Sequence, residues 1–416
     1  MGSFRLRPQM NSAEVKEENL EVEIERLLPG GVGLAHAEGL TLFVSLAAPG
    51  DIVRISIDRV QGKVGFASIA EIVKPSSVRV EPPCPYFGRC GGCDFQQLTY
   101  EAQLNAKIEI LRDCLHRIAR LEVPGDIAVH PSPNQWHYRA RANWQVEPIT
   151  SRLGYFERGS NLVCDVEYCA VLVPELQEAL QQVRNGIRQE SIEPPVRSID
   201  AVVGDEGVSM GPGIAQFQTR DVSRVIGKET YYFSAEAFFQ INYELLGPLI
   251  SEAIGGPTGA GQDRSAIDLY CGVGLFTLPL ARRFARVVGV EGSLRATEFA
   301  RHNLELAKLQ NAEIITARVG DWMKEDSRSF GALDFLLLDP PRAGCENSVI
   351  AGILALRPAR IAYVSCDPAT LARDLKKLIG GGDGQYSLDS IAAFDMFPQT
   401  HHVEVVTRLS ARSLLN

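Results

Sequence analysis

Cys366 stands at a position where a thiol can take part in chemistry. It follows the apolar run 361–364 and precedes Pro368, which can open a helix that continues to residue 379. This order predicts that Cys366 lies at the carboxyl end of a buried parallel strand, the edge at which open α/β sheets bind ligands. The adjacent helix amino terminus can favour the thiolate form. Cys366 is therefore a candidate nucleophile, although a lone cysteine is more often a small core residue.

A second group of cysteines has the spacing of a metal site. Cys84, Cys90 and Cys93 lie within ten residues around a glycine-rich turn. Three thiolates on one loop can hold a soft metal. The five residues between Cys84 and Cys90 exceed the usual zinc spacing, so an iron-sulfur cluster is favoured over zinc. The candidates for a fourth ligand are Cys114, Cys164 and Cys169.

Composition limits the class of protein. The chain has 416 residues, 45% of them hydrophobic and 22% charged, which suffices for two or three globular domains. Nine cysteines in a chain without a signal-peptide pattern indicate metal or catalytic use rather than disulfides. We expect a cytoplasmic location and no membrane contact. The net charge of -9 argues mildly against a large non-specific nucleic-acid surface.

The amino-terminal part predicts a small β-barrel. Residues 1–18 are polar and charged, and we expect a disordered tail there. Residues 19–75 contain four or five short segments of alternating apolar and polar residues, separated by glycine and proline turn signals. Short strands in this number favour a barrel like the oligonucleotide-binding fold, which often holds RNA.

Residues 76–245 predict a central α+β domain. After the cysteine loop comes a stretch of interleaved aromatic and basic side chains, and arginines beside aromatics can neutralise phosphates and stack bases of RNA. Residues 173–188 predict a helix, and residues 198–204 and 230–242 predict strands. Gln240 closes an aromatic run and, taken alone, is a packing or capping residue. The interleaved stretch contains Trp136, His137, Tyr138, Arg139, Arg141 and Trp144, and a following segment adds Arg152, Tyr155, Phe156 and Arg158.

Residues 246–416 alternate between strand and helix patterns, which predicts a doubly wound parallel sheet. Gly272 and Gly274 follow the first strand and allow a cofactor to approach the backbone. Glu291 ends the second strand, where a carboxylate suits the hydroxyls of an adenosine ribose. The third glycine of the nicotinamide fingerprint is missing, so S-adenosylmethionine is favoured over NAD.

Four motifs in order, DLYCGVGLFTLPLA, LLLDPPRAG, AYVSCDPATLARDL and DMFPQTHHVE, resemble the bacterial RNA uracil-5-methyltransferase family. The amino-terminal barrel is similar to the RNA-binding TRAM domain of that family, and the cysteine loop resembles its four-iron, four-sulfur site. The resemblance covers almost the whole chain. It is strongest to the enzymes of 23S ribosomal RNA, because the transfer RNA branch usually lacks both the barrel and the cluster.

The resemblance implies a role for particular residues. The family nucleophile falls on Cys366, and the base that removes the uracil proton falls on Glu404. Where many members have asparagine this chain has Leu275, which leaves a polar cofactor contact there in doubt. The implied cofactor contacts are Gln240, Tyr270, Glu291 and Asp339, and the implied cluster ligands are Cys84, Cys90, Cys93 and Cys169, with Cys164 second to Cys169.

The expected fold is α/β, with a Rossmann-like methyltransferase domain (246–416), an amino-terminal OB-like barrel (19–75) and a central iron-sulfur-bearing α+β domain (76–245). The expected reaction is transfer of a methyl group from S-adenosylmethionine to carbon 5 of a uridine in RNA, through a covalent bond between cysteine and carbon 6. The target base must leave its stack, which favours looped RNA. We expect a monomer with RNA as its partner. Alternatives are transfer RNA as substrate, cytosine as target base, or a non-catalytic iron-sulfur RNA-binding protein.

Overall fold

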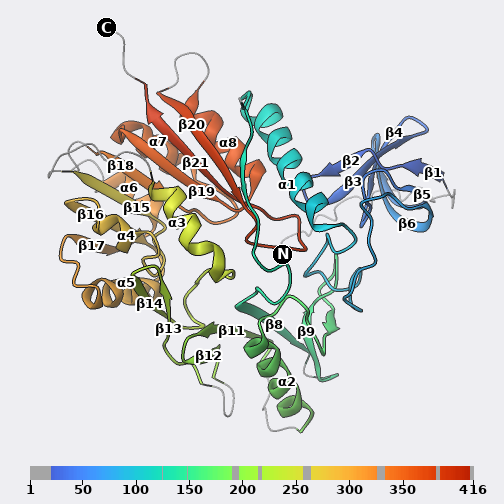
Figure 1. Cartoon of the computed structure of the whole chain (residues 1–416), viewed down its shortest axis with the longest axis horizontal. Coiled ribbons are helices and arrows are strands. Elements are labelled where there is room, and N and C mark those ends of the chain that lie inside the picture. Colours follow the sequence, from blue (N-terminus) through green and yellow to red (C-terminus); the bar gives the residue numbers. More distant parts are fainter. Residues whose placement is uncertain are drawn as a thin grey trace, which may run out of the picture. The chain divides into compact units, whose positions relative to one another are not determined.

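The computed structural model describes residues 20–123, 125–147, 149–189, 196–213, 218–255, 264–325, 333–380 and 385–412. The predicted disordered tail lies outside these residues. The described chain forms two compact units, one of residues 20–81 with 97–99 and one of residues 82–96 with 100–412 (Figure 1). Among the described helices, none is long and apolar enough to cross a membrane.

The smaller unit is a six-stranded sheet with the order β1-β5-β6-β4-β3-β2. Its alternating apolar residues form one core that includes Val44, Val53 and Ile55. The buried carboxylate of Asp51 accepts hydrogen bonds from the backbone of Ala48 and from the guanidinium of Arg79, which fixes the exit of the chain from this unit. The strands are β1 Leu20–Glu23, β2 Arg26–Leu28, β3 Val32–Ala37, β4 Leu40–Val44, β5 Ile52–Gln61 and β6 Val64–Lys74.

The larger unit begins with the cysteine loop and contains a five-stranded sheet of order β10-β9-β8-β11-β12. Helix α2 packs on this sheet, with Leu176 and Leu180 on its apolar face against Trp144 of β8. The predicted helix at 173–188 and the predicted strand at 198–204 are confirmed by α2 and β11. The elements are α1 Tyr100–Cys114, a π-helical turn Leu115–Ala119, β8 Arg141–Glu147, β9 Arg152–Phe156, β10 Val163–Asp165, α2 Pro174–Arg188, β11 Ser198–Gly204 and β12 Gly207–Gly211.

The larger unit also contains an eight-stranded sheet, in the order β17-β16-β15-β18-β19-β21-β20-β7 (Figure 1). Strands β17, β16, β15, β18 and β19 are parallel, which confirms the predicted doubly wound sheet. The strands are β7 Ala128–His130, β15 Ser265–Leu269, β16 Arg286–Glu291, β17 Ala312–Thr316, β18 Phe335–Leu338, β19 Arg360–Ser365, β20 Tyr386–Phe394 and β21 Glu404–Ala411.

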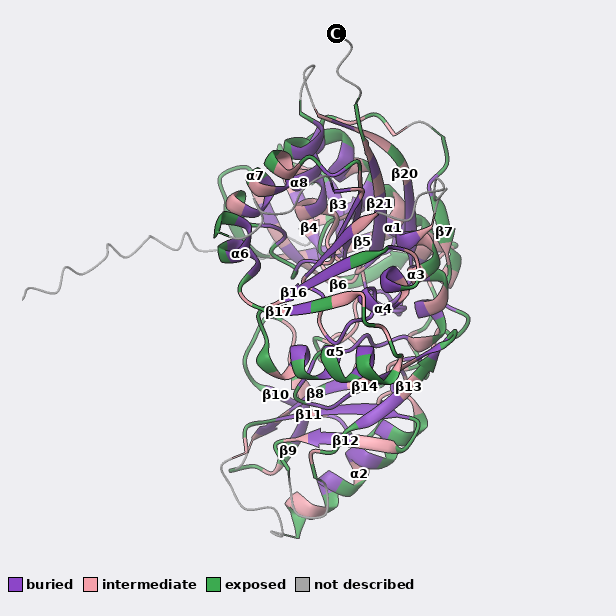
Figure 2. Ribbon diagram, turned by 90° about the vertical axis from the view of Figure 1, so that its left-hand side faces the viewer, coloured by how far each residue is buried: buried purple, intermediate pink, exposed green. Residues whose placement is uncertain are grey.

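Helices flank this sheet, and buried and exposed residues alternate along α5 (Figure 2). Helix α3 contacts α4, while α6, α7, α8 and α1 form a second contiguous row. The helix expected after the first strand is only the short α4. The helices are α3 Leu246–Ile254, preceded by a 3-10 turn Tyr243–Leu245, then α4 Thr277–Ala281, α5 Leu294–Leu306, α6 Val319–Glu325, α7 Asn347–Leu356 and α8 Pro368–Ile379.

The hairpin of β13 Val222–Ile226 and β14 Glu229–Phe233 precedes residue 246 but packs into the core of the large sheet. Tyr231 and Phe233 lie in one apolar cluster with Phe276 and Phe299. The predicted central and methyltransferase domains thus share one compact unit. The predicted strand at 230–242 ends at Phe233, and a loop continues to Gln240.

Strand direction decides where the chemistry can lie. β15 has β16 on one side and β18 on the other, so the chain order reverses there, and such a switch point opens a crevice at the carboxyl ends of the strands. Strand β21 runs antiparallel to β19, with Ser365 opposite Val405. Its first residue therefore lies at the same edge at which β15, β16, β18 and β19 end.

Candidate active site

The carboxyl edge of the large sheet opens into a cavity of about 650 Å³. This volume lies in the range of small-molecule sites. Every residue predicted to be catalytic or to contact the cofactor lines this one cavity, although the residues come from five strand ends and one loop. These residues are Gln240, Tyr270, Glu291, Asp339, Cys366 and Glu404.

The turn after β15 shows a conformation built for close approach. Tyr270 has a φ of 63°, which is uncommon for an aromatic residue and costs of order 1 kcal/mol or more. Gly272 has a φ of 54°, and a Cβ atom there would meet no atom within 4 Å. The carboxylate of Glu291 accepts hydrogen bonds from the backbone amides of Gly272, at 3.2 Å, and Ser293, at 2.7 Å. Two backbone amides thus fix Glu291 at the cavity, with lone pairs left to accept further hydrogen bonds.

The loop that carries Gln240 forms another wall. Gln240 is 6% exposed, and Phe239 before it stacks on Phe233 with ring centroids 4.1 Å apart. Phe238 also lines the cavity but is 61% exposed. Arg141 donates hydrogen bonds to the backbone oxygens of residues 235 and 237, which fixes the loop. The sequence carries no signal for Phe238, because an aromatic run does not reveal which ring is left exposed.

Three acidic groups share the catalytic end of the cavity. Burial, and after it the charges of Glu404 and Asp339, raise the pKa of Cys366 to about 12, although Arg342 acts in the opposite direction. Burial also raises the pKa of Asp339 to about 7. The pKa of Glu404, which is 2% exposed, is raised well above its usual value by burial and by Asp339.

The expectation that a helix amino terminus favours the thiolate of Cys366 is therefore wrong for the protein without ligands. Helix α8 does begin at Pro368, but the side chain of Asp367 caps it by accepting a hydrogen bond from the amide of Thr370 at 2.7 Å. The pKa of the thiol is raised first by burial and then by the nearby carboxylate of Glu404.

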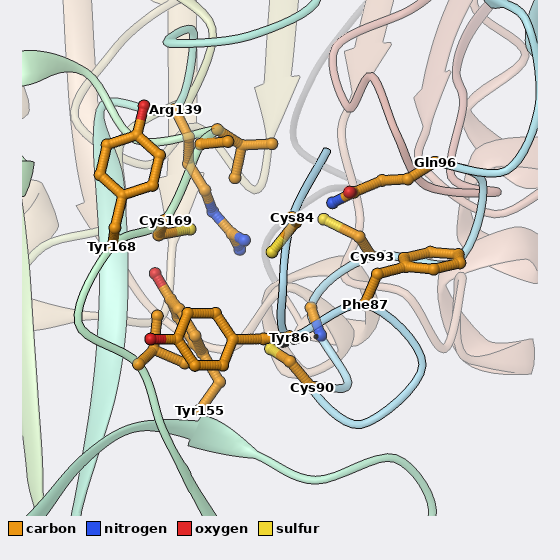
Figure 3. Close-up of a pocket in the computed structure, with 14 residues that line it drawn as sticks. Cys84, Tyr86, Phe87, Cys90, Cys93, Gln96, Arg139, Tyr155, Tyr168 and Cys169 are labelled. Carbon is orange, nitrogen blue, oxygen red and sulfur yellow. Dashed lines mark hydrogen bonds between the residues drawn. The ribbon is translucent and has the colours of Figure 1, made fainter. Parts of the chain in front are cut away.

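The cysteine loop forms a separate site in the same unit. Cys84, Cys90, Cys93 and Cys169 line one small cavity of about 20 Å³ (Figure 3). The other two candidate ligands point elsewhere. Cys164 is buried on β10 and accepts a hydrogen bond from Nε of Arg89 at 3.3 Å, and Cys114 is buried at the end of α1.

Three of these four thiols have a raised pKa, and one basic side chain lies among them. Burial raises the pKa of Cys90 to about 12 and also raises the pKa of Cys93 and of Cys169, so a bound cation would be needed to hold them as thiolates. The guanidinium of Arg139 points into the space between the cysteines (Figure 3) and also lines the active-site cavity. Among the described residues, no three His, Cys, Asp or Glu side chains are close enough together to hold a single metal ion.

Part of the predicted RNA-contact stretch is buried. Trp144 is fully covered by α2, and Tyr138 is 5% exposed and donates a hydrogen bond to the backbone oxygen of Pro398 at 2.8 Å. Neither ring can stack on RNA, so this part of the prediction is wrong. Phe156 is 42% exposed and Arg152 is exposed, which leaves them available for such contacts.

Comparison with known proteins identifies the family. The tRNA (uracil-5-)-methyltransferase family matches residues 214–412, and the TRAM domain matches residues 16–70. The chain is 32% identical to the 23S rRNA (uracil(1939)-C(5))-methyltransferase RlmD of Pectobacterium atrosepticum, over 94% of this chain and 93% of that protein. The chain belongs to the RNA (uracil-5-)-methyltransferase family.

Two further relatives of this methyltransferase extend the comparison. An uncharacterized RNA methyltransferase of Thermotoga maritima is 32% identical over 94% of this chain and 98% of that protein. The crystal structure of Pyrococcus abyssi tRNA (uracil-54, C5)-methyltransferase in complex with S-adenosyl-L-homocysteine is 25% identical, with a TM-score of 0.71 over 94% of this chain and 100% of that chain.

The shared burial of the acidic groups predicts how Cys366 reacts in the free enzyme. The rate of alkylation by iodoacetamide should rise about tenfold per pH unit throughout the range in which the protein stays folded, because only the thiolate reacts and its pKa of about 12 lies above that range. Peptide mass spectrometry measures this rate. At alkaline pH, Glu404→Gln should speed alkylation several-fold by removing a negative charge, and Arg342→Gln should slow it. A rate that levels off near the ordinary thiol pKa of about 8.5 would contradict this account.

Proposed function

We propose that this enzyme transfers the methyl group of S-adenosylmethionine to carbon 5 of a uridine in RNA, most favourably 23S ribosomal RNA. The observation that carries the proposal is the meeting of Cys366 and Glu404 in one cavity with the strand-end residues suited to an adenosine cofactor. Methylation of uracil at carbon 5 requires a nucleophilic thiol for the first step and a base that removes a proton in the last step. Cys366 and Glu404 supply these two groups.

The proposed reaction has three steps. The thiol of Cys366 gives its proton to water, and its sulfur bonds to carbon 6 of the uracil while the π electrons between carbons 5 and 6 move to form an enolate. Carbon 5 of this enolate then bonds to the methyl group, the bond between that methyl carbon and the sulfonium sulfur breaks, and S-adenosylhomocysteine would leave as a neutral thioether. Glu404 removes the proton from carbon 5, and the electron pair of the broken carbon–hydrogen bond re-forms the double bond and expels the sulfur of Cys366. Arg342, at the rim of the same cavity, opposes the negative charge of this region.

Binding of the cofactor would also change the protonation of these groups. The sulfonium carries a positive charge, and a nearby positive charge lowers the pKa of a thiol or a carboxyl. Cys366, Asp339 and Glu404 all have raised pKa values without it. A bound sulfonium would therefore favour the thiolate of Cys366 for the first step, whereas Asp339, with a pKa of about 7, is already partly ionised near neutral pH. The positive charge leaves with the methyl group, so Glu404 must be ionised by then to accept the proton of carbon 5.

We propose that Glu291 binds the ribose hydroxyls and that Tyr270, Gln240 and Asp339 complete the cofactor site. The fixed carboxylate of Glu291 beside Gly272 supports this assignment. Leu275 is buried at the cavity wall, and its backbone oxygen accepts a hydrogen bond from the hydroxyl of Tyr231 at 3.0 Å. Its side chain offers an apolar contact where many relatives have a polar one.

Ribosomal RNA is favoured because a relative named for 23S rRNA is 32% identical over 94% of this chain, whereas the similar tRNA methyltransferase is 25% identical over the same share. Transfer RNA is the second candidate, because the similar crystal structure is named for a tRNA methyltransferase. We also propose that the enzyme is cytoplasmic and monomeric.

We propose that Cys84, Cys90, Cys93 and Cys169 hold a four-iron, four-sulfur cluster. The donor set fits, because four thiols line one space. One zinc ion with bonds of about 2.3 Å would need its sulfurs nearly in contact, whereas a cluster places each sulfur on a different iron. The lining side chains must still rearrange to admit a cluster, since the present space of about 20 Å³ holds about one water molecule. Methyl transfer moves no net electrons, so the cluster would serve structure or RNA orientation.

A substrate panel tests the proposed reaction. The enzyme with labelled S-adenosylmethionine should methylate 23S ribosomal RNA that lacks the modification, and nucleoside analysis should identify 5-methyluridine. Cys366→Ala should reduce the rate by at least about 10³-fold, because the covalent route is lost. Transfer RNA and cytosine-containing sites serve as the comparison. Product on transfer RNA alone would replace the ribosomal assignment, and 5-methylcytidine would overturn the choice of base.

Removal of one cysteine tests the cluster. Cys90→Ser should lower the iron and sulfide content, abolish the visible absorbance of the cluster, and reduce stability or RNA affinity. Cys164→Ser is the matched control, because Cys164 is buried nearby but lies outside the cysteine cavity. Iron and sulfide assays on anaerobically purified protein measure the outcome. Loss of the cluster in Cys164→Ser but not in Cys90→Ser would mean that Cys164 is the ligand. A fully active, stable protein without iron would contradict the proposal of a cluster.

A further inference from the structure

The segment between β20 and β21 determines where Glu404 lies. Phe397 in this segment and Glu404 at its end both line the active-site cavity. Residues 395–403 form turns rather than a helix or strand. Their backbone must therefore be held by other parts of the chain.

Asp94 of the cysteine loop holds this segment directly. Asp94 follows Cys93, and its Oδ1 accepts a hydrogen bond from the backbone amide of His401 at 2.7 Å. Its Oδ2 lies 2.5 Å from Nδ1 of the same histidine. The backbone amides of Asp94 and Phe95 both donate to the carbonyl oxygen of Gln399 at 3.0 Å. The side chain of Asp94 is only 13% exposed, so these bonds are largely shielded from water.

The backbone at Gln399 would not keep its shape alone. Its φ of 69° lies in the left-handed region, which costs a non-glycine residue of order 1 kcal/mol or more and persists only where the surroundings enforce it. The side-chain oxygen of Gln399 accepts a hydrogen bond from Nε2 of Gln103 at 3.0 Å. The backbone amide of Gln399 donates a hydrogen bond to Oε1 of Gln103 at 2.9 Å.

Other contacts hold the start of the segment. Nζ of Lys107 on α1 pairs with the buried carboxylate of Asp395 and donates to the carbonyl oxygen of Phe397 at 3.1 Å. The segment thus has one anchor on α1 and a second on the cysteine loop. The second anchor lies nearest to Glu404, because His401 precedes it by three residues.

We propose that Asp94 is a positioning residue that sets the place of Glu404, so that the cysteine loop governs the proton-removal step. This inference rests on the proposed function of Cys366 and Glu404. Glu404 acts only after the methyl group has been transferred. A displaced Glu404 would leave the carbon 5 proton in place, and the methylated uracil would stay bonded to the sulfur of Cys366 through carbon 6.

The test compares Asp94→Ala with the wild-type full-length enzyme on ordinary substrate RNA. We expect kcat to fall about 10- to 100-fold, the effect of a displacement of about 1 Å at a reacting group, with little change in KM for RNA. Mass spectrometry of quenched reactions should show a methylated RNA adduct on the peptide that contains Cys366, as Glu404→Gln should also show. The iron content should stay unchanged, because all four cysteines remain.

Two further variants serve as controls. Asp94→Asn keeps an oxygen that can accept from the amide of His401, and we expect it to recover most of kcat and to lose the adduct. Asp126→Ala removes a fully exposed acidic side chain of the same unit and should behave as wild type. If Asp94→Ala does not fold, His401→Ala replaces it, because that variant keeps the backbone contact to Asp94.

Each outcome is decisive. A lower kcat with accumulated methylated adduct supports the inference. An unchanged kcat overturns the inference, because Asp94 then has no effect on catalysis. A lower kcat without the methylated adduct also overturns it, because the defect then precedes proton removal. A wild-type enzyme that transfers no methyl group to any RNA overturns the proposed function itself, which is a separate and recognisable result.

Discussion

Burial of a thiol and two carboxyl groups in one cavity is the constraint on which the rest of this structure depends. Burial raises the pKa of Cys366, Asp339 and Glu404, and the negative charges of the carboxylates oppose ionisation of their neighbours. Cys366, with a pKa of about 12, therefore holds its proton near neutral pH, and Asp339, with a pKa of about 7, is partly ionised. A positive charge bound in the cavity would lower these pKa values and favour the reactive thiolate. A free enzyme with a protonated thiol is protected from oxidation and alkylation, since the thiolate is the form that reacts. The sheet makes this grouping possible because β19 ends and β21 begins at the same edge.

The same edge depends on contacts from far away in the sequence. Glu404 opens β21, and the segment before it is held by α1 through Lys107 and by the cysteine loop through Asp94. A site that performs no redox step in the proposed reaction can thereby affect catalysis through position alone. This gives the cysteine loop a physical role that does not require electron transfer. It also accounts for the placement of a strained residue, Gln399, between the two sites.

The sequence predicted those features that depend on local pattern. Strands that end abruptly placed Glu291, Asp339 and Cys366 at one edge, and the structure brings them together. Gln240 and Glu404 lie on a loop and at the start of an antiparallel strand, which leave no local signal, so only the family motifs pointed to them. Trp144 was misread because alternation does not show which face of a strand a helix will cover. The protonation of Cys366 was misread because its neighbours come from distant segments. The contact between Asp94 and His401 likewise joins residues that no local pattern relates.

The most direct test of the central claim is to trap the proposed covalent intermediate. RNA that contains 5-fluorouridine cannot lose a proton from carbon 5, so the reaction should stop after methyl transfer. The account predicts a stable protein–RNA adduct that carries the transferred methyl group and maps to the peptide containing Cys366, and it predicts no adduct with Cys366→Ala. Methylation of ordinary RNA by the same preparation without any adduct, or an adduct on another residue, would contradict it.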